Sequence, residues 1–198
     1  MGRMLLILVT LSAGLLLAGL WIPLKAVMAQ ELLTLAWART QAAQQQSPPW
    51  PWADTWPVAQ LQLPGESSAL VVLSGGHGES LAFGPGQVVG PEPGVQPSAP
   101  VVIAGHRDTH FRPLEAIRPE DPVRLQFADG DWRRYRVASV RVVDSRQEQI
   151  ELGRYDQNSL VLVTCYPFDS VDASGPLRFV VEATRDLSHP VSALPAGA

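Results

Sequence analysis

The chain has a single cysteine and a single lysine among its 198 residues. One cysteine excludes an intramolecular disulfide framework, and without a second cysteine there is no pair to build a zinc knuckle. Charged residues are also scarce, at 17% of the chain, and the formal net charge of −4 argues against a nucleic acid as partner. Apolar residues make up 46% of the chain, so it is not disordered, and its length suits one or at most two domains.

The first 29 residues contain two basic residues and no acidic one, which leaves a net charge of −6 on the remaining 169 residues. Residues 4–22 form an uncharged apolar run, which as a helix is about 28 Å long, close to the hydrocarbon thickness of a bilayer. We predict an uncleaved, single-span membrane anchor in residues 1–29. A cleavable signal sequence that ends at Val27-Met28-Ala29 is the alternative. Arg3 favours the cytoplasmic side, so the rest of the chain is expected to cross the membrane whether residues 1–29 are an anchor or a signal sequence.

Residues 30–57 are expected to be a helix followed by a stiff linker. Residues 31–46 are rich in Ala, Leu and Gln and lack Gly and Pro, which predicts a helix that ends before two prolines. Three tryptophans interleaved with proline follow, at Trp50, Trp52 and Trp56. We interpret these rings as packing on the body or at the membrane interface, and a partner-binding strip is the alternative.

From residue 58 onward the apolar pattern becomes strand-like. Short β-branched or alternating runs, separated by turns rich in Gly, Pro and Asp, predict an all-β barrel or sandwich. Residues 111–117 and 79–83 are expected to be short helices, and residues 84–99 and 144–159 to be loops. The predicted strands are residues 58–63, 69–73, 100–104, 123–127, 132–143, 160–163 and 177–183.

Two side chains that could take part in catalysis follow predicted strands. Cys165 comes directly after an apolar run and before a Tyr-Pro pair, which predicts a thiol at a barrel rim. An unpaired thiol in an exported chain is a candidate nucleophile, although free cysteines are often buried and inert. His106 has the matching position on another strand, and an imidazole is the usual proton carrier for a thiol. His106 and His110 have a spacing that can bind zinc on a helix, but no acidic residue completes a metalloprotease pattern.

Arg178 is the third candidate, because it interrupts an otherwise apolar strand. A guanidinium beside a thiol can orient a carbonyl group or stabilise an oxyanion, and an outward position on an edge strand is the alternative. The triplet His106-Arg107-Asp108 also occurs in kinase catalytic loops. No glycine-rich loop or lysine accompanies it here, so we interpret this match as chance.

Together these segments resemble the sortase family of membrane-anchored cysteine transpeptidases. The resemblance rests on residues 105–111 (GHRDTHF), on residues 162–167 (LVTCYP) and on Arg178, thirteen residues after the cysteine. The chain departs from the family pattern at Val161, where most sortases carry threonine. The tryptophan-rich segment and the residues around the cysteine look most like the Gram-negative, proteobacterial class.

The resemblance implies a mainly β fold, a closed barrel of about eight strands with short helices, in residues 58–186. From the patterns above, residues 1–29 are expected to be the membrane anchor or a signal sequence, residues 30–57 a helical and Trp/Pro-rich linker, and the small, polar residues 187–198 a disordered tail. The protein would then lie in the inner membrane as a single-pass protein, with its catalytic domain on the periplasmic side.

The chemistry of the family is implied residue by residue. Cys165 would attack a peptide carbonyl in a C-terminal sorting signal of the Leu-Pro-x-Thr-Gly type on a partner protein. His106 would protonate the leaving amine and later deprotonate an acceptor amine, and Arg178 would hold the developing oxyanion. Val163 and Thr164, next to the nucleophile, are implied as substrate contacts.

The loop of residues 144–159 is expected to select the substrate, because in sortases the loop before the cysteine strand walls the binding groove. It contains Glu148 and Glu151, and some family members bind calcium nearby. Two carboxylates are too few to predict a calcium site, so no cofactor is expected. Two other functions stay open: a plain cysteine hydrolase on the same barrel, and a non-catalytic, membrane-tethered barrel that binds a partner.

Overall fold

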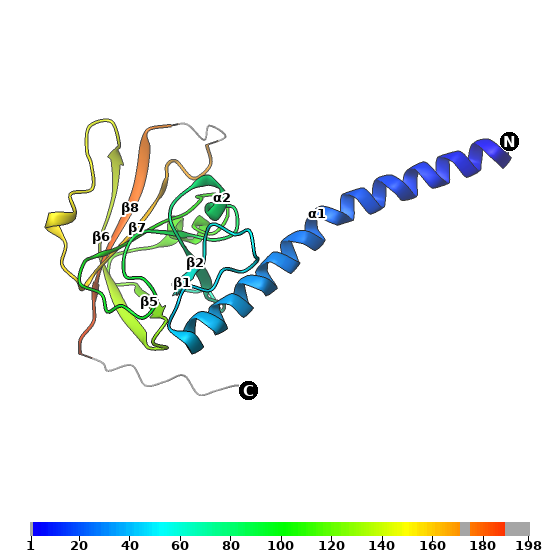
Figure 1. Cartoon of the computed structure of the whole chain (residues 1–198). Coiled ribbons are helices and arrows are strands. Elements are labelled where there is room, and N and C mark those ends of the chain that lie inside the picture. The colour runs from blue at the N-terminus through cyan, green and yellow to red at the C-terminus, as the bar shows by residue number, and fades with distance from the viewer. Residues whose placement is uncertain (1, 171–174, 189–198) are drawn as a thin grey trace.

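Eight strands close into one barrel in the computed structural model of the chain, which describes residues 2–170 and 175–188 (Figure 1). Around the barrel their order is β1-β2-β3-β4-β7-β8-β6-β5. The predicted mainly β class and the closed barrel are therefore confirmed. The strands are β1 (Pro57–Gln62), β2 (Leu70–Ser74), β3 (Gly86–Val89), β4 (Val101–Ala104), β5 (Pro122–Phe127), β6 (Trp132–Asp144), β7 (Ser159–Cys165) and β8 (Leu177–Arg185).

The sequence pattern does not predict β3, because residues 84–99 are rich in glycine and proline and are expected to form a loop. That expectation is wrong for Gly86–Val89, which pair in parallel with β2 and antiparallel with β4. Gly86 lies so close to the carbonyl oxygen of Gly75 that a Cβ atom would overlap with it. The glycine therefore serves the close approach of two backbone segments, and it does not break the strand.

Helical segments accompany the barrel at the expected positions. The predicted short helices near residues 79–83 and 111–117 are both present, and a third short turn lies inside the long connection between β6 and β7. The predicted disordered tail, residues 187–198, lies outside the described residues from residue 189 onward. The helical segments that the structure describes are α1 (Gly2–Ala43), α2 (Gly78–Leu81), and the 3₁₀ turns η1 (Arg112–Ala116) and η2 (Leu152–Arg154).

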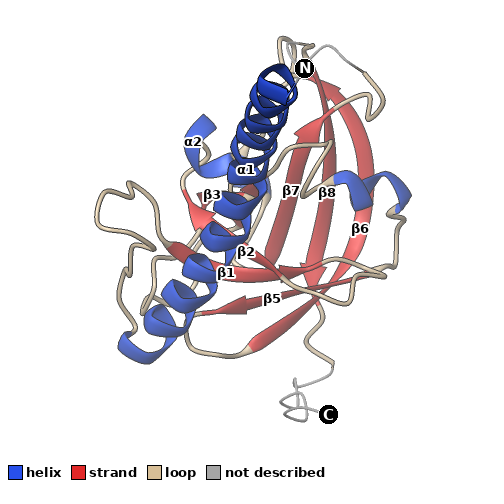
Figure 2. Ribbon diagram, turned by 90° about the vertical axis from the view of Figure 1, so that its right-hand side faces the viewer, coloured by secondary structure: helices blue, strands red, loops and turns tan. Residues whose placement is uncertain are grey.

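α1 is one continuous helix that joins the apolar run to the predicted linker helix, and it ends three residues before the expected residue 46. Its C-terminal half lies across β1 and β2 (Figure 2) and buries Leu33, Ala36 and Trp37, which share one helical face. Its N-terminal half extends away from the barrel (Figure 1), and the large apolar side chains described there, such as Leu11 and Leu15, are exposed. In the described part of the chain, α1 is the one helix long and apolar enough to cross a membrane.

The tryptophan-rich linker divides into packed and exposed rings. Trp50 makes an edge-to-face contact with Phe83, with ring centroids 5.1 Å apart. Trp56 packs against the barrel core, and its Nε1 donates a hydrogen bond of 3.0 Å to Glu92. Trp52, in contrast, is 83% exposed. Packing on the body of the protein is therefore confirmed for Trp50 and Trp56. It is wrong for Trp52, whose ring does not pack on the barrel.

Alternation along the strands produces two apolar clusters, one inside the barrel and one outside it. The inner cluster contains side chains such as Leu61, Ile103 and Tyr135 from different strands. The outer cluster is covered by Ile150 and Tyr155 from the connection between β6 and β7, which we call the wall loop (residues 145–158). The wall loop is therefore packed against the outer face of the strands on which the candidate site lies. The buried members of the outer cluster are Val102, Val143, Val161 and Val180.

Candidate functional site

Three strand ends meet at one rim of the barrel. β4 and β7 are parallel neighbours, so their C-terminal ends lie at the same rim, and β8 is antiparallel to β7, so its N-terminal end joins them. His106 comes two residues after the end of β4, Cys165 is the last residue of β7, and Arg178 is the second residue of β8. All three candidate catalytic residues therefore belong to adjacent strands at one rim.

The register brings the three residues to the same level. Ala104 is opposite Val163, and the Gly105 amide donates to the Val163 carbonyl at 3.1 Å, so the pairing continues past the end of β4. His106 lies two residues after Ala104, and Cys165 lies two residues after Val163. Across the other edge of β7, Cys165 is directly opposite Arg178. The thiol is half-buried, the imidazole is exposed, and Arg178 is half-buried.

Because side chains alternate along a strand, Val161, Val163 and Cys165 share the outer face of β7. Their partners on β8 share that face too, and they include Glu182 opposite Val161 and Arg178 opposite Cys165. Val163 is half-exposed beside the thiol, whereas Val161 is fully buried in the outer cluster. Val161, the residue that departs from the family pattern, is thus covered by the wall loop and packed within the outer cluster.

Thr164 lies on the opposite, inner face of β7 and is 3% exposed. Its Oγ1 donates a hydrogen bond of 2.7 Å to the carbonyl oxygen of Gly105, the residue before His106. The hydroxyl therefore links the strand end that carries the thiol to the one that carries the imidazole. Contact between Thr164 and a substrate stays a prediction, since this hydroxyl already serves the backbone.

Arg178 is held by the backbone on its own side of the rim. Its Nη1 donates to the carbonyl oxygens of Gly175 at 2.6 Å and Leu177 at 2.9 Å. These two bonds hold the guanidinium of the residue that is paired with Cys165 across β7 and β8. A guanidinium that is fixed in this way supplies rigid donors, which is the property that oxyanion stabilisation requires.

Two arginines that the sequence analysis did not assign hold the segment after the cysteine. Arg107 is only 7% exposed, and its Nη2 donates to the carbonyl oxygen of Ser170 at 2.7 Å. Arg112 donates to the Phe168 carbonyl at 3.1 Å and to the Asp169 carboxylate at 2.9 Å. Both come from the segment after β4, so the chain beyond His106 clamps the chain beyond Cys165. In the sequence, the position of Arg107 directly after His106 could have indicated this role. The triplet His106-Arg107-Asp108 was instead interpreted as a chance match to kinase catalytic loops.

His110 lies beside a small hollow of about 200 Å³ whose lining includes Leu63, Leu70 and Pro113. Burial, and then the electrostatic effect of His106, lower the pKa of His110, and the carboxylate of Asp108 opposes them only in part. The described residues contain no group of three or more His, Cys, Asp or Glu side chains arranged to hold a metal ion.

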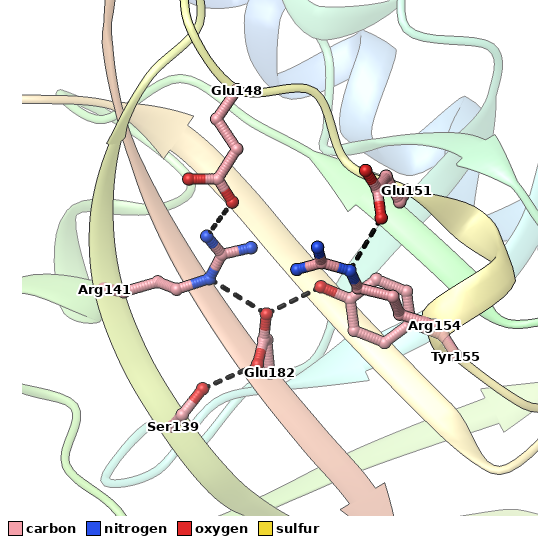
Figure 3. A network of polar contacts seen from close by, with 7 residues as sticks. All are labelled: Ser139, Arg141, Glu148, Glu151, Arg154, Tyr155 and Glu182. Carbon is pink, nitrogen blue, oxygen red and sulfur yellow. Dashed lines mark hydrogen bonds and ion pairs between the residues drawn. The ribbon is translucent and has the colours of Figure 1, made fainter.

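A polar network fastens the wall loop to the barrel (Figure 3). Glu182 on β8 accepts hydrogen bonds from the Tyr155 hydroxyl at 2.6 Å, from Ser139 at 2.7 Å and from Arg141 Nε at 3.0 Å. Burial, the largest effect, raises the pKa of Glu182, but these three hydrogen bonds together outweigh it and leave the pKa lowered. Arg141 also pairs with Glu148 of the wall loop, so the network joins β6, β8 and the loop.

The two carboxylates predicted in the wall loop are both engaged with arginines. Glu148 pairs with Arg141, and Glu151 pairs with Arg154 at 2.7 Å. Calcium in proteins takes six to eight oxygen ligands, and here each carboxylate would have to exchange a guanidinium for the ion. These residues do not fit a calcium site. Their part in substrate selection stays a prediction, and in this structure they stabilise the loop.

The strand ends define a class of protein: a closed β-barrel with a thiol, an imidazole and a guanidinium gathered at one rim. A family model described as the sortase domain matches residues 61–186. The match covers well over half of the chain, and the chain belongs to the sortase family.

Individual sortases are similar over comparable lengths. Sortase D of Bacillus subtilis (strain 168) is 28% identical over 128 residues, which are 63% of this chain and 62% of that protein, so the match spans less than two thirds of the relative. Sortase A from Corynebacterium diphtheriae has a TM-score of 0.54 at 23% identity, covering 74% of this chain and 66% of that one. A Clostridium perfringens sortase D5 transpeptidase has a TM-score of 0.57 at 16% identity, covering 81% and 99%. These two likenesses show the fold.

Proposed function

We propose that this chain is a membrane-anchored cysteine transpeptidase that cleaves a C-terminal sorting signal of a partner protein and transfers the new C-terminus to an amine. The observation that carries the proposal is the register at the rim. It brings His106, Cys165 and Arg178 together on three adjacent strands of a sortase barrel.

The proposed reaction has two acyl-transfer steps. The Cys165 thiolate attacks the scissile carbonyl, an S–C bond forms, and the C–N bond breaks as His106 gives a proton to the leaving amine. The acceptor amine then attacks the thioester, His106 removes its proton, and the thiolate is released. Arg178 stabilises the oxyanion that develops in both steps, because this residue is paired with Cys165 across β7 and β8 and its guanidinium is held by two carbonyl groups.

We propose that an extended peptide binds along the outer face of β7. Val163 is half-exposed on the same face as Cys165 and leads toward the wall loop. We propose that Val163 contacts the residues of the signal before the scissile bond, and that the wall loop selects among signals of the Leu-Pro-x-Thr-Gly type. Glu148 and Glu151 would act there through the position of the loop, since both are paired with arginines.

We infer the position of the protein in the cell from α1. Residues 1–29 would be the anchor, residues 30–57 the linker that docks on the barrel, residues 58–186 the catalytic domain, and residues 187–198 the tail. The anchor would span the inner membrane once and leave the barrel in the periplasm, as expected for the proteobacterial class. The apolar N-terminal half of α1 supports this arrangement.

Mass spectrometry of the intact full-length chain in detergent tests the reaction. Incubation with a Leu-Pro-x-Thr-Gly peptide is expected to join the acyl fragment that precedes the scissile bond to Cys165 as a thioester, with release of the amine fragment. Addition of an amine should move the acyl fragment onto the added amine. Cys165→Ala should form no adduct and His106→Ala should abolish turnover, whereas His77→Ala, at an exposed histidine outside the site, should behave like wild type. No adduct with any peptide of a sorting-signal library would sink the proposal.

A hydrolase on the same barrel is the second candidate, because the half-buried thiol at the rim is also open to water. The two functions differ in the product. A transpeptidase yields the peptide joined to the added amine, and a hydrolase yields the free carboxylate at every amine concentration.

A further inference from the structure

An apolar cleft of about 730 Å³ lies between α1 and the tryptophan-rich linker, and the proposed reaction does not use it. None of the three candidate catalytic residues lines it. The size is typical of a site for a small molecule. Its lining includes Trp21, Lys25 and Leu32 of α1, Trp52 and Asp54 of the linker, and Phe83.

The cleft begins where the apolar run of the anchor ends. Residues 4–22 form that run, and Trp21 and Lys25, one helical turn apart, form the first part of the lining. The Lys25 ammonium lies 5.0 Å from the centre of the Trp21 ring. Tryptophan and lysine are the side chains that mark the boundary between hydrocarbon and water. If the run spans the bilayer, the cleft lies at the membrane surface.

The barrel cannot move freely away from that surface, because the next part of α1 is packed on it through Leu33, Ala36 and Trp37. The same helix that enters the membrane therefore fixes the barrel. Trp52, which the barrel leaves 83% exposed, lines the cleft on the side opposite α1. Tryptophan is enriched at membrane–water interfaces, where an exposed ring is favourable.

The charges in the lining are of both signs. Lys25 lies on the α1 side, and Asp54 lies on the linker side next to Trp52. A phosphate complements the ammonium of Lys25, and an ammonium group complements the carboxylate of Asp54. A phospholipid headgroup that contains both a phosphate and an amino alcohol presents these two charges together.

We propose that the cleft binds one zwitterionic phospholipid, with an acyl chain against Leu32 and Phe83 and the headgroup between Lys25 and Asp54. The proposal rests on the membrane anchorage given under the proposed function. The bound lipid covers Trp52.

Native mass spectrometry of the full-length chain, released from nanodiscs of equal phosphatidylethanolamine and phosphatidylglycerol, tests the proposal. Wild type is expected to retain one phosphatidylethanolamine. Leu32→Glu puts a charge in the cleft and should reduce the lipid-bound fraction about tenfold or more. Leu35→Glu, at an exposed leucine of the same helix that does not line the cleft, is the matched control and should retain the lipid.

Fluorescence in nanodiscs with brominated acyl chains gives a second measurement that does not depend on the folding of Leu32→Glu. Trp52→Phe should remove emission that the bromine quenches. Trp132→Phe, at a β6 ring that lies against the Arg124 guanidinium of β5, should remove emission that the bromine does not quench. Unquenched Trp52 emission would overturn the proposal.

Each of the remaining outcomes would reject part or all of the proposal. Lipid retained equally by wild type and Leu32→Glu, or by neither, rejects the site, and preferential retention of phosphatidylglycerol rejects the headgroup assignment. A lipid-free dimer means that a second copy of the chain covers the cleft. Carbonate extraction separates the two proposals: release of the chain from membranes refutes the anchorage and the lipid site together, whereas a retained chain without lipid refutes the lipid site alone.

Discussion

Replacing Thr164 by valine removes one hydroxyl group at nearly constant volume, one residue before the candidate nucleophile. In the native protein this hydroxyl donates a 2.7 Å hydrogen bond to the Gly105 carbonyl, across a sequence separation of 59 residues. Gly105 precedes His106. The substitution therefore removes a link between the strand ends that carry the thiol and the imidazole, and it alters neither group.

The magnitude follows from burial. Thr164 is 3% exposed and Gly105 is buried, so water does not readily replace the missing donor. Leaving a buried carbonyl without its partner costs about 1–3 kcal/mol, which for a domain of this size lowers the unfolding midpoint by about 3–10 °C. Thr164→Ser is the matched control: it keeps the hydroxyl and loses one buried methyl group, at a cost of about 1 kcal/mol.

The free energies of unfolding of Thr164→Val and Thr164→Ser can be similar, but their rates of thioester formation should differ. A shift of the strand ends by about 1 Å can cost on the order of 100-fold in rate, so we expect thioester formation to slow about 10- to 100-fold in Thr164→Val and about twofold in Thr164→Ser. Denaturant unfolding and the rate of adduct formation at Cys165, measured on the same preparations, provide the comparison. Adduct formation at the wild-type rate in Thr164→Val would refute the alignment role of the hydroxyl. Equal slowing in both variants would assign the effect to stability.

Two further predictions concern the segments that border the rim. Glu182→Gln should lower the free energy of unfolding by about 1–2 kcal/mol at pH 7, because its hydrogen bonds lose their charged acceptor. The folded-state pKa of Glu182 lies below its ordinary value of 4.5, so the carboxylate stabilises the protein above that pH and the contribution is lost as the pH falls through the folded value. Unfolding curves of wild type and Glu182→Gln should thus converge on acidification, and a constant difference down to pH 3 would contradict this. Arg107→Lys should speed amide hydrogen exchange around Ser170 about tenfold, because a lysine does not reproduce the guanidinium bond to that carbonyl. Unchanged exchange there would show that Arg107 does not hold the segment.

Local patterns were enough to predict most of the barrel. Seven of the eight observed strands lie within two residues of the predicted ranges, because alternation and β-branched content are properties of each segment by itself. β3 was the exception, since the reason for Gly86 lies in the backbone of Gly75, which approaches from another strand. The same limit applies to Trp52, whose exposure depends on what packs beside it.

The candidate site shows the same division. The sequence is sufficient to put a thiol, an imidazole and a guanidinium at strand ends, and the order of the motifs supplies the family resemblance. It does not predict that Arg107 clamps the carbonyl of Ser170. It also does not predict that Arg141 of β6 holds Glu148 of the wall loop. Both contacts join residues whose neighbours are set by strand pairing.

The sequence alone determined that this is a largely apolar chain with one long membrane-length run, a set of short strands and a single thiol, because these features depend on composition and on spacing within a segment. Only the tertiary structure decided that β4 and β7 pair in parallel, which brings His106 to the level of Cys165 and Arg178. It also decided that α1 continues from the apolar run onto the barrel and leaves a cleft beside Trp52. Such features are fixed by the register and packing of segments that are distant in sequence, where burial and hydrogen bonding between strands determine which residues meet.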